Sequence, residues 1–449
     1  MNTKFTLLAV FFCTISFFAH AVTPALVWAN SVGKDSSETV VGIKKDFAGN
    51  IYIAGSFDGV NVDFDPGAGT SLKSTNGLQD LYIVKYTAAG AFSWAITMGG
   101  TNADVVNGMD VDSAGNVYIV GAFLSTTLDM NPGAGTNNIS NNAGFSAYFA
   151  KYNTSGVYQY AYAIGGSTST LNTRFDDVKV TNDNVAFYVT GFSTDSTVDF
   201  DPGVGVSKTS ALPNGDVIVA KYLASGTSLG AIGFIGTDGF DNGSRLHTDA
   251  AGNFFLHGQF QSTNLNIGTA ASPINIPNGG AVGTHDVFYC KLSGTGANLG
   301  FIPIGSGGNE SLGDITSNKA GFMYAIGRGL TGTDIDPFGP TPTMTSNGGW
   351  DIFMCKFELV AGTAVNTNTY GGVNNDFPLD IQIGRDGKLC MAGQFAGTNV
   401  NVSTAGNPFN LSSNAGNWDG YYNRYDSSFN HITAFAVGGT NVDASRSIL

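Results

Sequence analysis

Short apolar runs recur along the whole chain and are separated by turns rich in Gly, Asn and Asp. In the first clear unit, this pattern predicts four strands over residues 40–45, 51–57, 81–86 and 92–98. The turn between the first two strands, Asp46-Phe-Ala-Gly-Asn50, suits a hairpin, because Asp accepts bonds from backbone amides and Gly adopts positive φ. Runs such as Leu-Tyr-Ile-Val within the third strand are apolar at every position, so we expect both faces of the sheet to be covered.

This unit is repeated six times. A glycine near the end of the second strand recurs every 66 to 70 residues, at Gly55, Gly121, Gly191, Gly258, Gly327 and Gly393. A basic residue in the third strand keeps the same period, at Lys85, Lys151, Lys221, Lys291, Lys356 and Arg424. Radial stacking of four-stranded antiparallel sheets covers both faces of each sheet and produces a β-propeller. The sequence therefore predicts an all-β propeller with six complete repeats of about 68 residues plus a partial seventh.

The repeats divide the chain into a predicted signal peptide, 1–21, and a propeller, 22–449. The expected repeat bounds are about 34–100, 101–166, 167–236, 237–308, 309–372 and 373–439, with the partial repeat at 440–449. Residues 25–33 align with the fourth strand of the first repeat, and Asp443 stands where a seventh repeat would begin. From this we expect a truncated product of a longer gene encoding a seven-bladed ring, present here as an open or strained six-bladed one.

The first 21 residues have the features of an export signal. A basic Lys4 precedes the apolar stretch 5–18, and Ala19-His-Ala21 places small residues where a signal peptidase cleaves. We therefore expect a secreted or cell-surface protein, and no later segment is apolar enough to cross a membrane. The remaining cysteines, Cys290, Cys355 and Cys390, are odd in number and lie in apolar strand runs, which indicates buried thiols rather than disulfides.

Several of these positions together resemble a known repeat. The run from Asp112 to Phe123, followed by Leu-Asp-Met-Asn-Pro-Gly at 128–133 and Ala-Lys-Tyr at 150–152, is similar to the β-propeller repeats named SBBP. The resemblance covers essentially the whole mature chain and implies a propeller in a secreted or surface-attached bacterial protein. It implies no activity, since members of that family mostly lack an assigned one. Repeats three to five depart from the pattern, as in Asn182-Asp-Asn184, which lacks the glycine turn.

Composition narrows the possible partners. The chain has 62 Gly and 12% charged residues, and Glu occurs at three positions, which disfavours helices. A hydrophobic content of 42% excludes collagen and low-complexity disorder. A formal net charge of −14 argues against nonspecific binding to nucleic acid or anionic lipid, and we expect a monomer.

One series of acidic residues precedes the first strand of most repeats. Its members predicted to line a ligand-binding upper rim around the axial channel are Glu38, Asp104, Asp241, Glu310 and Asp376. Asp443 continues the series, and Arg174 interrupts it. Two interpretations stay open: a rim that binds a cation or ligand, and carboxylates that order the turn between blades.

A second acidic series follows the second strand. Asp63-Phe-Asp65-Pro-Gly67 has counterparts beginning at Asp129, Asp199 and Asp334. Two carboxylates on one face of an extended segment could contribute to a Ca²⁺ site, although Ca²⁺ takes six to eight oxygens; the alternative is a turn closed by Asp and Pro-Gly. We expect no other cofactor.

Each blade is also expected to carry an ion pair on the opposite, lower face. The predicted pairs are Lys85 with Asp46, Lys151 with Asp112 and Lys291 with Asp249.

No catalytic constellation emerges from the sequence. Gly226-Thr-Ser-Leu-Gly230 fits a nucleophile-elbow pattern but falls in a turn between strands with no following helix, and the histidines show no metal spacing. The favoured hypothesis is a binding, adhesion or scaffold module for extracellular glycan or protein ligands. The alternative is an extracellular hydrolase or lyase that acts on polysaccharide through the upper-rim carboxylates. A pocket of acidic and aromatic residues specific to one blade would separate the two.

Overall fold

A computed structural model provides the structure of this chain. It describes residues 27–33, 37–141, 144–165, 172–195, 198–203, 215–233, 239–249, 251–267, 274–277, 284–305, 308–318, 321–336, 343–358, 364–403, 409–414 and 417–448. The predicted leader, 1–21, lies outside these residues. Within the described ranges there is no α-helix, and hence none that is long and apolar enough to span a bilayer.

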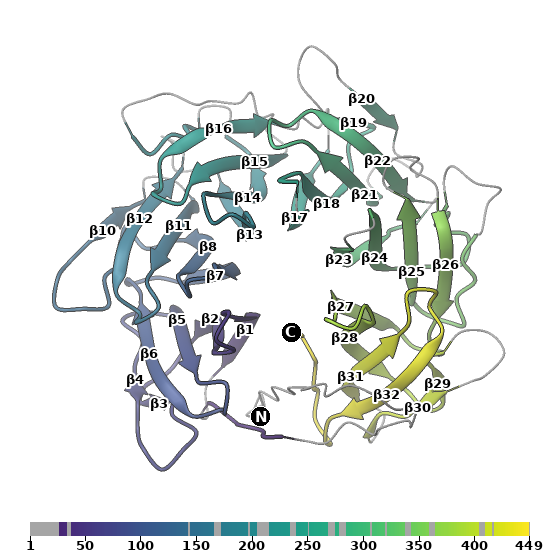
Figure 1. Cartoon of the computed structure of the whole chain (residues 1–449), viewed down its shortest axis with the longest axis horizontal. Helices are drawn as coiled ribbons and strands as arrows, with labels where there is room; N and C mark the ends of the chain where they lie inside the picture. Colours follow the sequence, from purple (N-terminus) through teal and green to yellow (C-terminus); the bar gives the residue numbers. More distant parts are fainter. Residues whose placement is uncertain are drawn as a thin grey trace.

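Six four-stranded antiparallel sheets are arranged radially as the blades of a β-propeller (Figure 1). The innermost strands are β1 (Glu38–Lys45), β7 (Asp104–Val111), β13 (Thr173–Val180), β17 (Asp241–Thr248), β23 (Ser311–Ser317) and β27 (Asp376–Ile383). The second strands are β2 (Ile51–Phe57), β8 (Val117–Phe123), β14 (Ala186–Ser193), β18 (Phe254–Phe260), β24 (Phe322–Gly329) and β28 (Leu389–Ala396). The third strands are β5 (Asp80–Tyr86), β11 (Ser146–Tyr152), β15 (Asp216–Leu223), β21 (Asp286–Leu292), β25 (Asp351–Glu358) and β31 (Trp418–Tyr425). The outermost strands are β6 (Phe92–Met98), β12 (Tyr158–Ile164), β16 (Ser228–Gly233), β22 (Asn298–Ile304), β26 (Ala364–Tyr370) and β32 (His431–Val437). The predicted all-β propeller of six four-stranded blades is confirmed.

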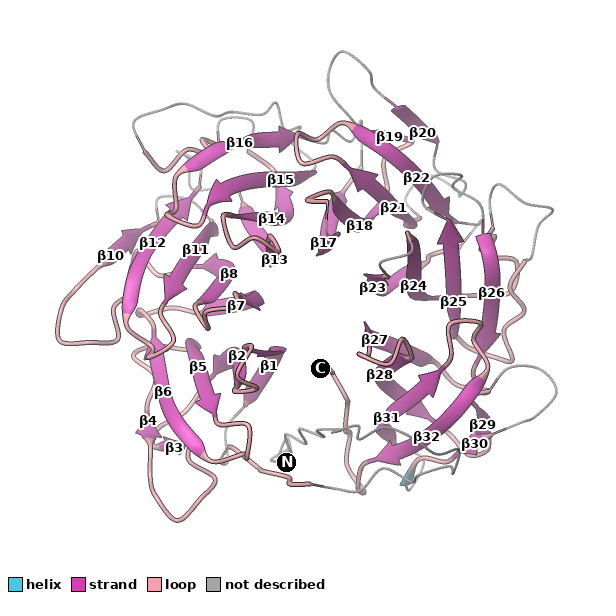
Figure 2. Cartoon of the chain, viewed as in Figure 1, coloured by secondary structure: helices cyan, strands magenta, loops and turns pink. Residues whose placement is uncertain are grey.

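Four of the long links between second and third strands form small hairpins of their own at the rim of the ring (Figure 2). They are β3 (Val62–Asp63) with β4 (Leu72–Lys73), β9 (Thr127–Asp129) with β10 (Asn138–Ser140), β19 (Asn264–Ile267) with β20 (Ile274–Pro277), and β29 (Val400–Asn401) with β30 (Asn410–Leu411). We call the face that carries these links the upper face. The first strand of each blade starts there.

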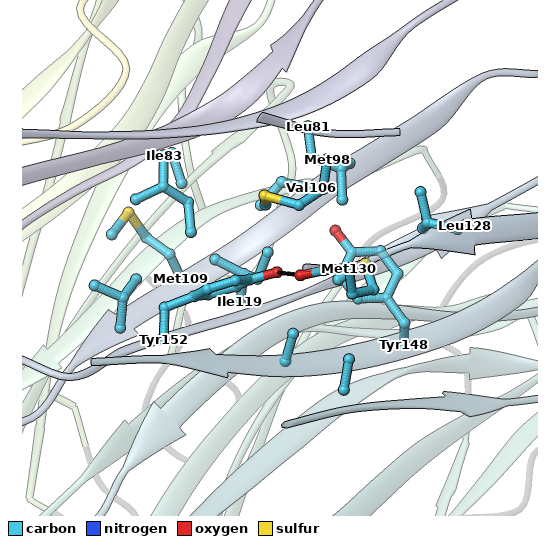
Figure 3. Packing of buried hydrophobic residues seen from close by; sticks show 14 of the residues in the cluster. Leu81, Ile83, Met98, Val106, Met109, Ile119, Leu128, Met130, Tyr148 and Tyr152 are labelled. Atoms are coloured by element: carbon cyan, nitrogen blue, oxygen red, sulfur yellow. Dashed lines mark hydrogen bonds between the residues drawn. The ribbon is translucent and has the colours of Figure 1, made fainter. Parts of the chain in front are cut away.

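The core lies between the blades. All seven residues of β2 are buried, because a neighbouring surface covers each face of its sheet. Between the first two blades, Leu81 and Ile83 of β5 belong to the same buried cluster as Met109 of β7 (Figure 3). In the same cluster the Tyr152 hydroxyl donates a 2.8 Å hydrogen bond to the Met130 carbonyl. An aromatic side chain thus fills the core while its polar end is satisfied by a loop.

The hairpin turns follow the predicted chemistry. Asp46 accepts hydrogen bonds from the Asn50 backbone N–H (2.9 Å) and side-chain amide (2.7 Å), and Gly49 has φ of 85°. Asp112 makes the same bonds to Asn116 in the next blade. A local sequence therefore specifies this turn without help from distant residues.

On the lower face, the repeated lysine joins one blade to the next. Lys85 donates to the Thr154 carbonyl (3.0 Å) with its ammonium 4.9 Å from the centre of the Tyr52 ring, and Lys151 donates to the Ala224 carbonyl (3.1 Å). The predicted ion pairs with Asp46 and Asp112 do not form. The third predicted pair does: Lys291 Nζ lies 3.0 Å from Asp249 Oδ2. In the first two blades the ammonium instead donates to a carbonyl of the neighbouring blade's turn, which lies nearer to it than the aspartate of its own blade.

A second set of contacts joins the blades near the axis. The carboxylate of Asp110 accepts a hydrogen bond from the Val180 backbone N–H (2.9 Å), and Asp177 accepts one from Leu246 (2.8 Å). Asp314 and Ile381 repeat this contact at 3.4 Å. We call these contacts the axial latches.

The described ends of the chain lie on the flanks of blades 6 and 1. The Ile448 N–H donates to Asp380 Oδ2 (2.7 Å), as first strands do in the axial latches. The indole of Trp28 lies against Gly90 of blade 1, as that of Trp94 lies against Gly156 of blade 2. The sheet of blade 6 is completed by its own outer strand, β32, and not by residues 27–33.

Candidate functional site

The predicted acidic rim is buried beneath the loops of the upper face. Asp104 and Asp241 are 0% exposed, Glu310 and Asp376 are 1% exposed, and Glu38 is 8% exposed. The side chains of these carboxylates are therefore largely shielded from solvent.

Hydrogen bonds to nearby loops account for their positions. Asp104 accepts bonds from the Gly100 N–H (2.9 Å) and from the Ser125 hydroxyl (2.8 Å). Asp241 accepts the Ser262 hydroxyl in the same way. At the start of blades 5 and 6, the Thr333 hydroxyl donates to Glu310 (3.0 Å) and the Gly372 N–H donates to Asp376 (2.7 Å). These four carboxylates order the link between blades, as the alternative interpretation expects, and ligand binding by the rim stays a prediction.

A second buried carboxyl stands beside two of these residues. Asp80 neighbours Asp104, and Asp351 neighbours Asp376 across Gly371, where a Cβ would lie 2.4 Å from Asp351 Oδ1 and 2.8 Å from Asp376 Oδ2. Burial, and then the charge of Asp351, raises the pKa of Asp376 to about 7. Burial raises the pKa of Asp351 and of Asp80 to about 6. At neutral pH each of these pairs therefore carries less than the two negative charges that two ionised aspartates would give.

The Asp-x-Asp-Pro-Gly segments are closed turns. Asp63 Oδ1 accepts the backbone N–H groups of Asp65 (3.0 Å) and Ser71 (2.7 Å), and Asp65 Oδ1 accepts that of Gly67 (2.8 Å). Across the described residues, no group of three or more His, Cys, Asp or Glu side chains is arranged to hold a metal ion. Calcium binding at these loops stays a prediction.

The remaining nucleophile candidates are structural. Cys290 and Cys355 are buried free thiols, and burial raises the pKa of each, so neither is activated. Gly226 has φ of 91° in the turn between β15 and β16, which is the strand turn expected from its context.

A groove opens on the upper face over blade 6, beside its boundary with blade 5. Its volume is about 380 Å³, and it is lined by Gly349, Val373, Asn374, Asn375, Ala396 and Trp418. Asn374 Nδ2 donates to the Ala396 carbonyl (3.3 Å), and Asn375 Oδ1 accepts the Trp350 backbone N–H (2.9 Å). The second polar atom of each amide makes no hydrogen bond to the described residues, and both side chains are exposed.

Aromatic rings continue from this groove toward blade 5. The rings of Trp418 and Phe377 are 4.9 Å apart, centre to centre. The Arg328 guanidinium carbon lies 3.9 Å from the centre of the Phe377 ring and 3.8 Å from that of Trp350. We call Trp350, Arg328, Phe377 and Trp418 the stacked row. Arg328 is held between two aromatic faces, and Trp418 ends the row inside the groove.

The electrostatics of the row differ from those of the axis. Burial lowers the pKa of Arg328 to about 9, which still leaves it charged at neutral pH. Near the axis, by contrast, Asp177 and the other carboxylates around Arg245 raise the pKa of that arginine despite its burial. The axial charges are therefore compensated among themselves, whereas the positive charge of the stacked row is not.

The arrangement can hold a flat, hydroxyl-rich ligand. An indole face supplies apolar stacking, and the neighbouring amides supply a donor and an acceptor without a net charge. The sequence does carry a signal for the aromatic residues of this site. At the upper end of the third strand, the residue just before Asp80, Ser146, Asp216 or Asp286 is Gln79, Phe145, Gly215 or His285 in the first four blades, but the residue before Asp351 and Asp419 in the last two is Trp350 and Trp418.

Comparisons with known proteins are consistent with a repeat propeller. No family model matches the chain. An alignment of 229 positions, which covers 44% of this chain, is 23% identical to an uncharacterised WD repeat-containing protein of Acanthamoeba polyphaga mimivirus, of which it spans 16%.

Solved structures that the comparison matches to this chain include a protein of unknown function from Bacteroides caccae, at 10% identity over 77% of this chain and 86% of that one, with a TM-score of 0.32. A europium-containing methanol dehydrogenase is matched at 10% identity over 80% of this chain and 84% of that one, with a TM-score of 0.33. The observed blades and the WD-repeat similarity together fit a repeat propeller, a fold that supports a binding or scaffold module in general.

Proposed function

We propose that this protein is an exported binding module that takes glycan ligands in the groove over blade 6. One observation carries the proposal: Trp418 and the exposed Asn374 and Asn375 line one polar groove of about 380 Å³. Single members of this set recur elsewhere, as Asn102, Asn309 and Trp350, but no other blade combines a tryptophan with two asparagines at the corresponding positions. Sugars present an apolar face and a rim of hydroxyls, which match an indole face and amide groups.

The rigid ring favours recognition over chemistry. Carboxylates next to the groove, such as Asp376 and Asp419, are buried under the loops and accept bonds from backbone amides. A hydrolase would need an acid and a base within reach of the ligand. The groove offers its ligand amides and an aromatic ring, so a binding module is the function it supports best.

Glycan-array screening of the purified mature chain, followed by calorimetric titration with the best ligand, tests this proposal. We expect Trp418→Ala to weaken binding about tenfold or more, because a central aromatic anchor commonly contributes more than 1 kcal/mol. Gln79→Ala is the matched control, since it alters the corresponding position of blade 1. Equal affinities for both variants, or no glycan bound by wild type, would contradict the proposal.

We also propose export and a secreted or cell-surface location, supported by the leader-like residues 1–21 and by the similarity of the repeat to SBBP propellers. Mass spectrometry of the exported protein is expected to find Val22 as its first residue. A protein that retains residues 1–21 would contradict cleavage at this site.

A further inference from the structure

The stacked row contains a positive charge that no ion pair among the described residues neutralises. We propose that Arg328 makes the groove selective for acidic glycans, whose sugars carry a carboxylate. This inference deepens the proposed function and rests on it. It adds the class of ligand and the residue that selects it.

The first step is the geometry of the guanidinium. Its carbon is 3.8 Å from the centre of the Trp350 ring and 3.9 Å from that of Phe377, so both of its faces are covered. Two covering faces fix the plane of the group and leave its N–H donors along the edge. A planar, fixed fork matches a carboxylate, which accepts two parallel hydrogen bonds.

Arg328 also differs from other arginines of the ring in having no carboxylate partner among the described residues. Elsewhere on the upper face, Arg174 lies 4.6 Å from the centre of the Phe192 ring, yet its Nε also forms a 2.6 Å ion pair with Asp176. On the lower face Arg424 pairs with Asp386. Arg328 makes no ion pair or side-chain hydrogen bond to the described residues. Stacking on an aromatic ring therefore does not prevent an arginine from forming an ion pair. Arg174 in blade 3 has both contacts, whereas within the described ranges Arg328 has only the stacking.

The third step concerns the nearest carboxyls. Asp351 and Asp376 follow Trp350 and precede Phe377 in the sequence, but each is 1% exposed and bound to a backbone N–H, of Asn347 (2.8 Å) and Gly372 (2.7 Å). They are turned into the link between the blades. Their charge is therefore not presented to a ligand lying over the stacked row.

The fourth step is the position of the row relative to the groove. Phe377 contacts Arg328 on one side and Trp418 on the other, and Trp418 lines the groove. Arg328 does not itself line the groove, but the row leads from Trp418 past Phe377 to its guanidinium. An oligosaccharide that stacks on Trp418 and continues along the row toward blade 5 would bring the carboxylate of a further sugar to the edge of Arg328. Because the whole protein carries a formal net charge of −14, its long-range field does not attract polyanions. Selectivity for an acidic sugar must then come from a local contact.

Calorimetric titration with a matched pair of ligands tests the inference. The probes are a galacturonic acid hexamer and the same hexamer with its carboxyl groups reduced to alcohols. We expect wild type to bind the acidic hexamer about tenfold more tightly than the neutral one, as a charge-assisted bidentate contact would provide. Arg328→Gln should lower the acidic affinity to the neutral value, while Trp418→Ala lowers both. Arg328→Lys should give an intermediate affinity, since lysine keeps the charge without the planar fork.

Arg424→Gln on the lower face is the matched control, because it removes the same charge far from the groove. If Arg424→Gln weakens acidic binding as much as Arg328→Gln does, the effect is one of net charge and the inference is wrong. Equal binding of both hexamers by wild type overturns the selectivity and leaves glycan binding intact. Binding of neither hexamer also overturns the acidic-glycan inference, while the glycan-array screen decides the proposed function separately. The wild-type comparison needs no variant, so it decides the question even where Arg328→Gln fails to fold.

Discussion

Replacing His257 with leucine is expected to stabilise the protein. His257 lies in the middle of β18, is 0% exposed and stacks on Tyr289 with ring centres 5.8 Å apart. Neither of its ring nitrogens has a hydrogen-bond partner within the part of the chain that the structure describes. The corresponding residues of three other blades, Ala54, Val120 and Ile326, are apolar. A buried polar group without a partner costs about 1 to 3 kcal/mol, so His257→Leu should raise the free energy of unfolding by about that amount at pH 7.

The gain should grow as the pH falls. Burial, followed by the charge of Arg245, holds the pKa of His257 well below its usual range. The unfolded chain takes up a proton near pH 6.5 while the folded chain does not, so wild type loses stability as the pH drops below that value. Linkage gives a loss of about 2 kcal/mol between pH 7 and pH 5. The variant has no such proton to bind, and its advantage should rise by the same amount.

Urea unfolding followed by tryptophan fluorescence at pH 7 and pH 5 measures both effects. Ile326→Leu is the control, because it changes an apolar residue at the same position of blade 5 and should leave the pH dependence unchanged. A His257→Leu variant that is less stable than wild type, or whose advantage is the same at both pH values, would refute the reasoning.

Four further predictions concern the turns, the blade contacts and the upper face. Asp376→Asn should be more stable than wild type at pH 8, on the order of 1 to 3 kcal/mol, because the raised pKa of Asp376 marks a carboxylate whose charge is disfavoured in the fold. A raised carboxyl pKa makes the folded wild type more stable as the pH falls, so the advantage of the variant should shrink toward pH 5. Equal gains at both pH values in urea unfolding would contradict this. Gly49→Val should lower the melting temperature more than Gly69→Val, since Gly49 has φ of 85° and a Cβ there costs about 1 kcal/mol or more; equal shifts would argue against backbone strain. Lys85→Met should cost about 1 to 3 kcal/mol by removing its bond to the Thr154 carbonyl, and an unchanged urea midpoint would show that the contact contributes little. Adding a chelator should leave the wild-type melting temperature unchanged, because the Asp-x-Asp-Pro-Gly carboxylates already accept amide bonds, and a fall in that temperature would instead support the calcium hypothesis.

The sequence was sufficient for the blades because their signals are local. The turn closed by Asp46 and Gly49 needs only five consecutive residues, and the continuous apolar runs of the second and third strands indicate burial on both faces. The same signals recur in phase, so the errors of a single strand assignment are averaged over six repeats.

Local sequence patterns could not predict the contacts between blades. The partner of Lys85 is the Thr154 carbonyl, 69 residues further along, and a carbonyl carries no sequence signal. Asp104 was placed on an open rim because the loop that covers it, at Ser125, follows 21 residues later and nothing local shows that it folds back. Arg328 and Phe377 come from different blades, so only the assembled ring brings them into contact.

The axial latches have a consequence for how such a ring can change over generations. In each latch the acceptor is a side chain, but the donor is a main-chain N–H, of Val180, Leu246 or Ile381. Any residue except proline can donate from that position, so a mutation on the receiving blade leaves the joint intact. A duplicated blade would fit beside its parent at once, and its exposed loops could then diverge freely. The architecture of the ring can therefore be kept while its surface loops change, and a groove at a single blade boundary is the kind of local feature that such a joint permits.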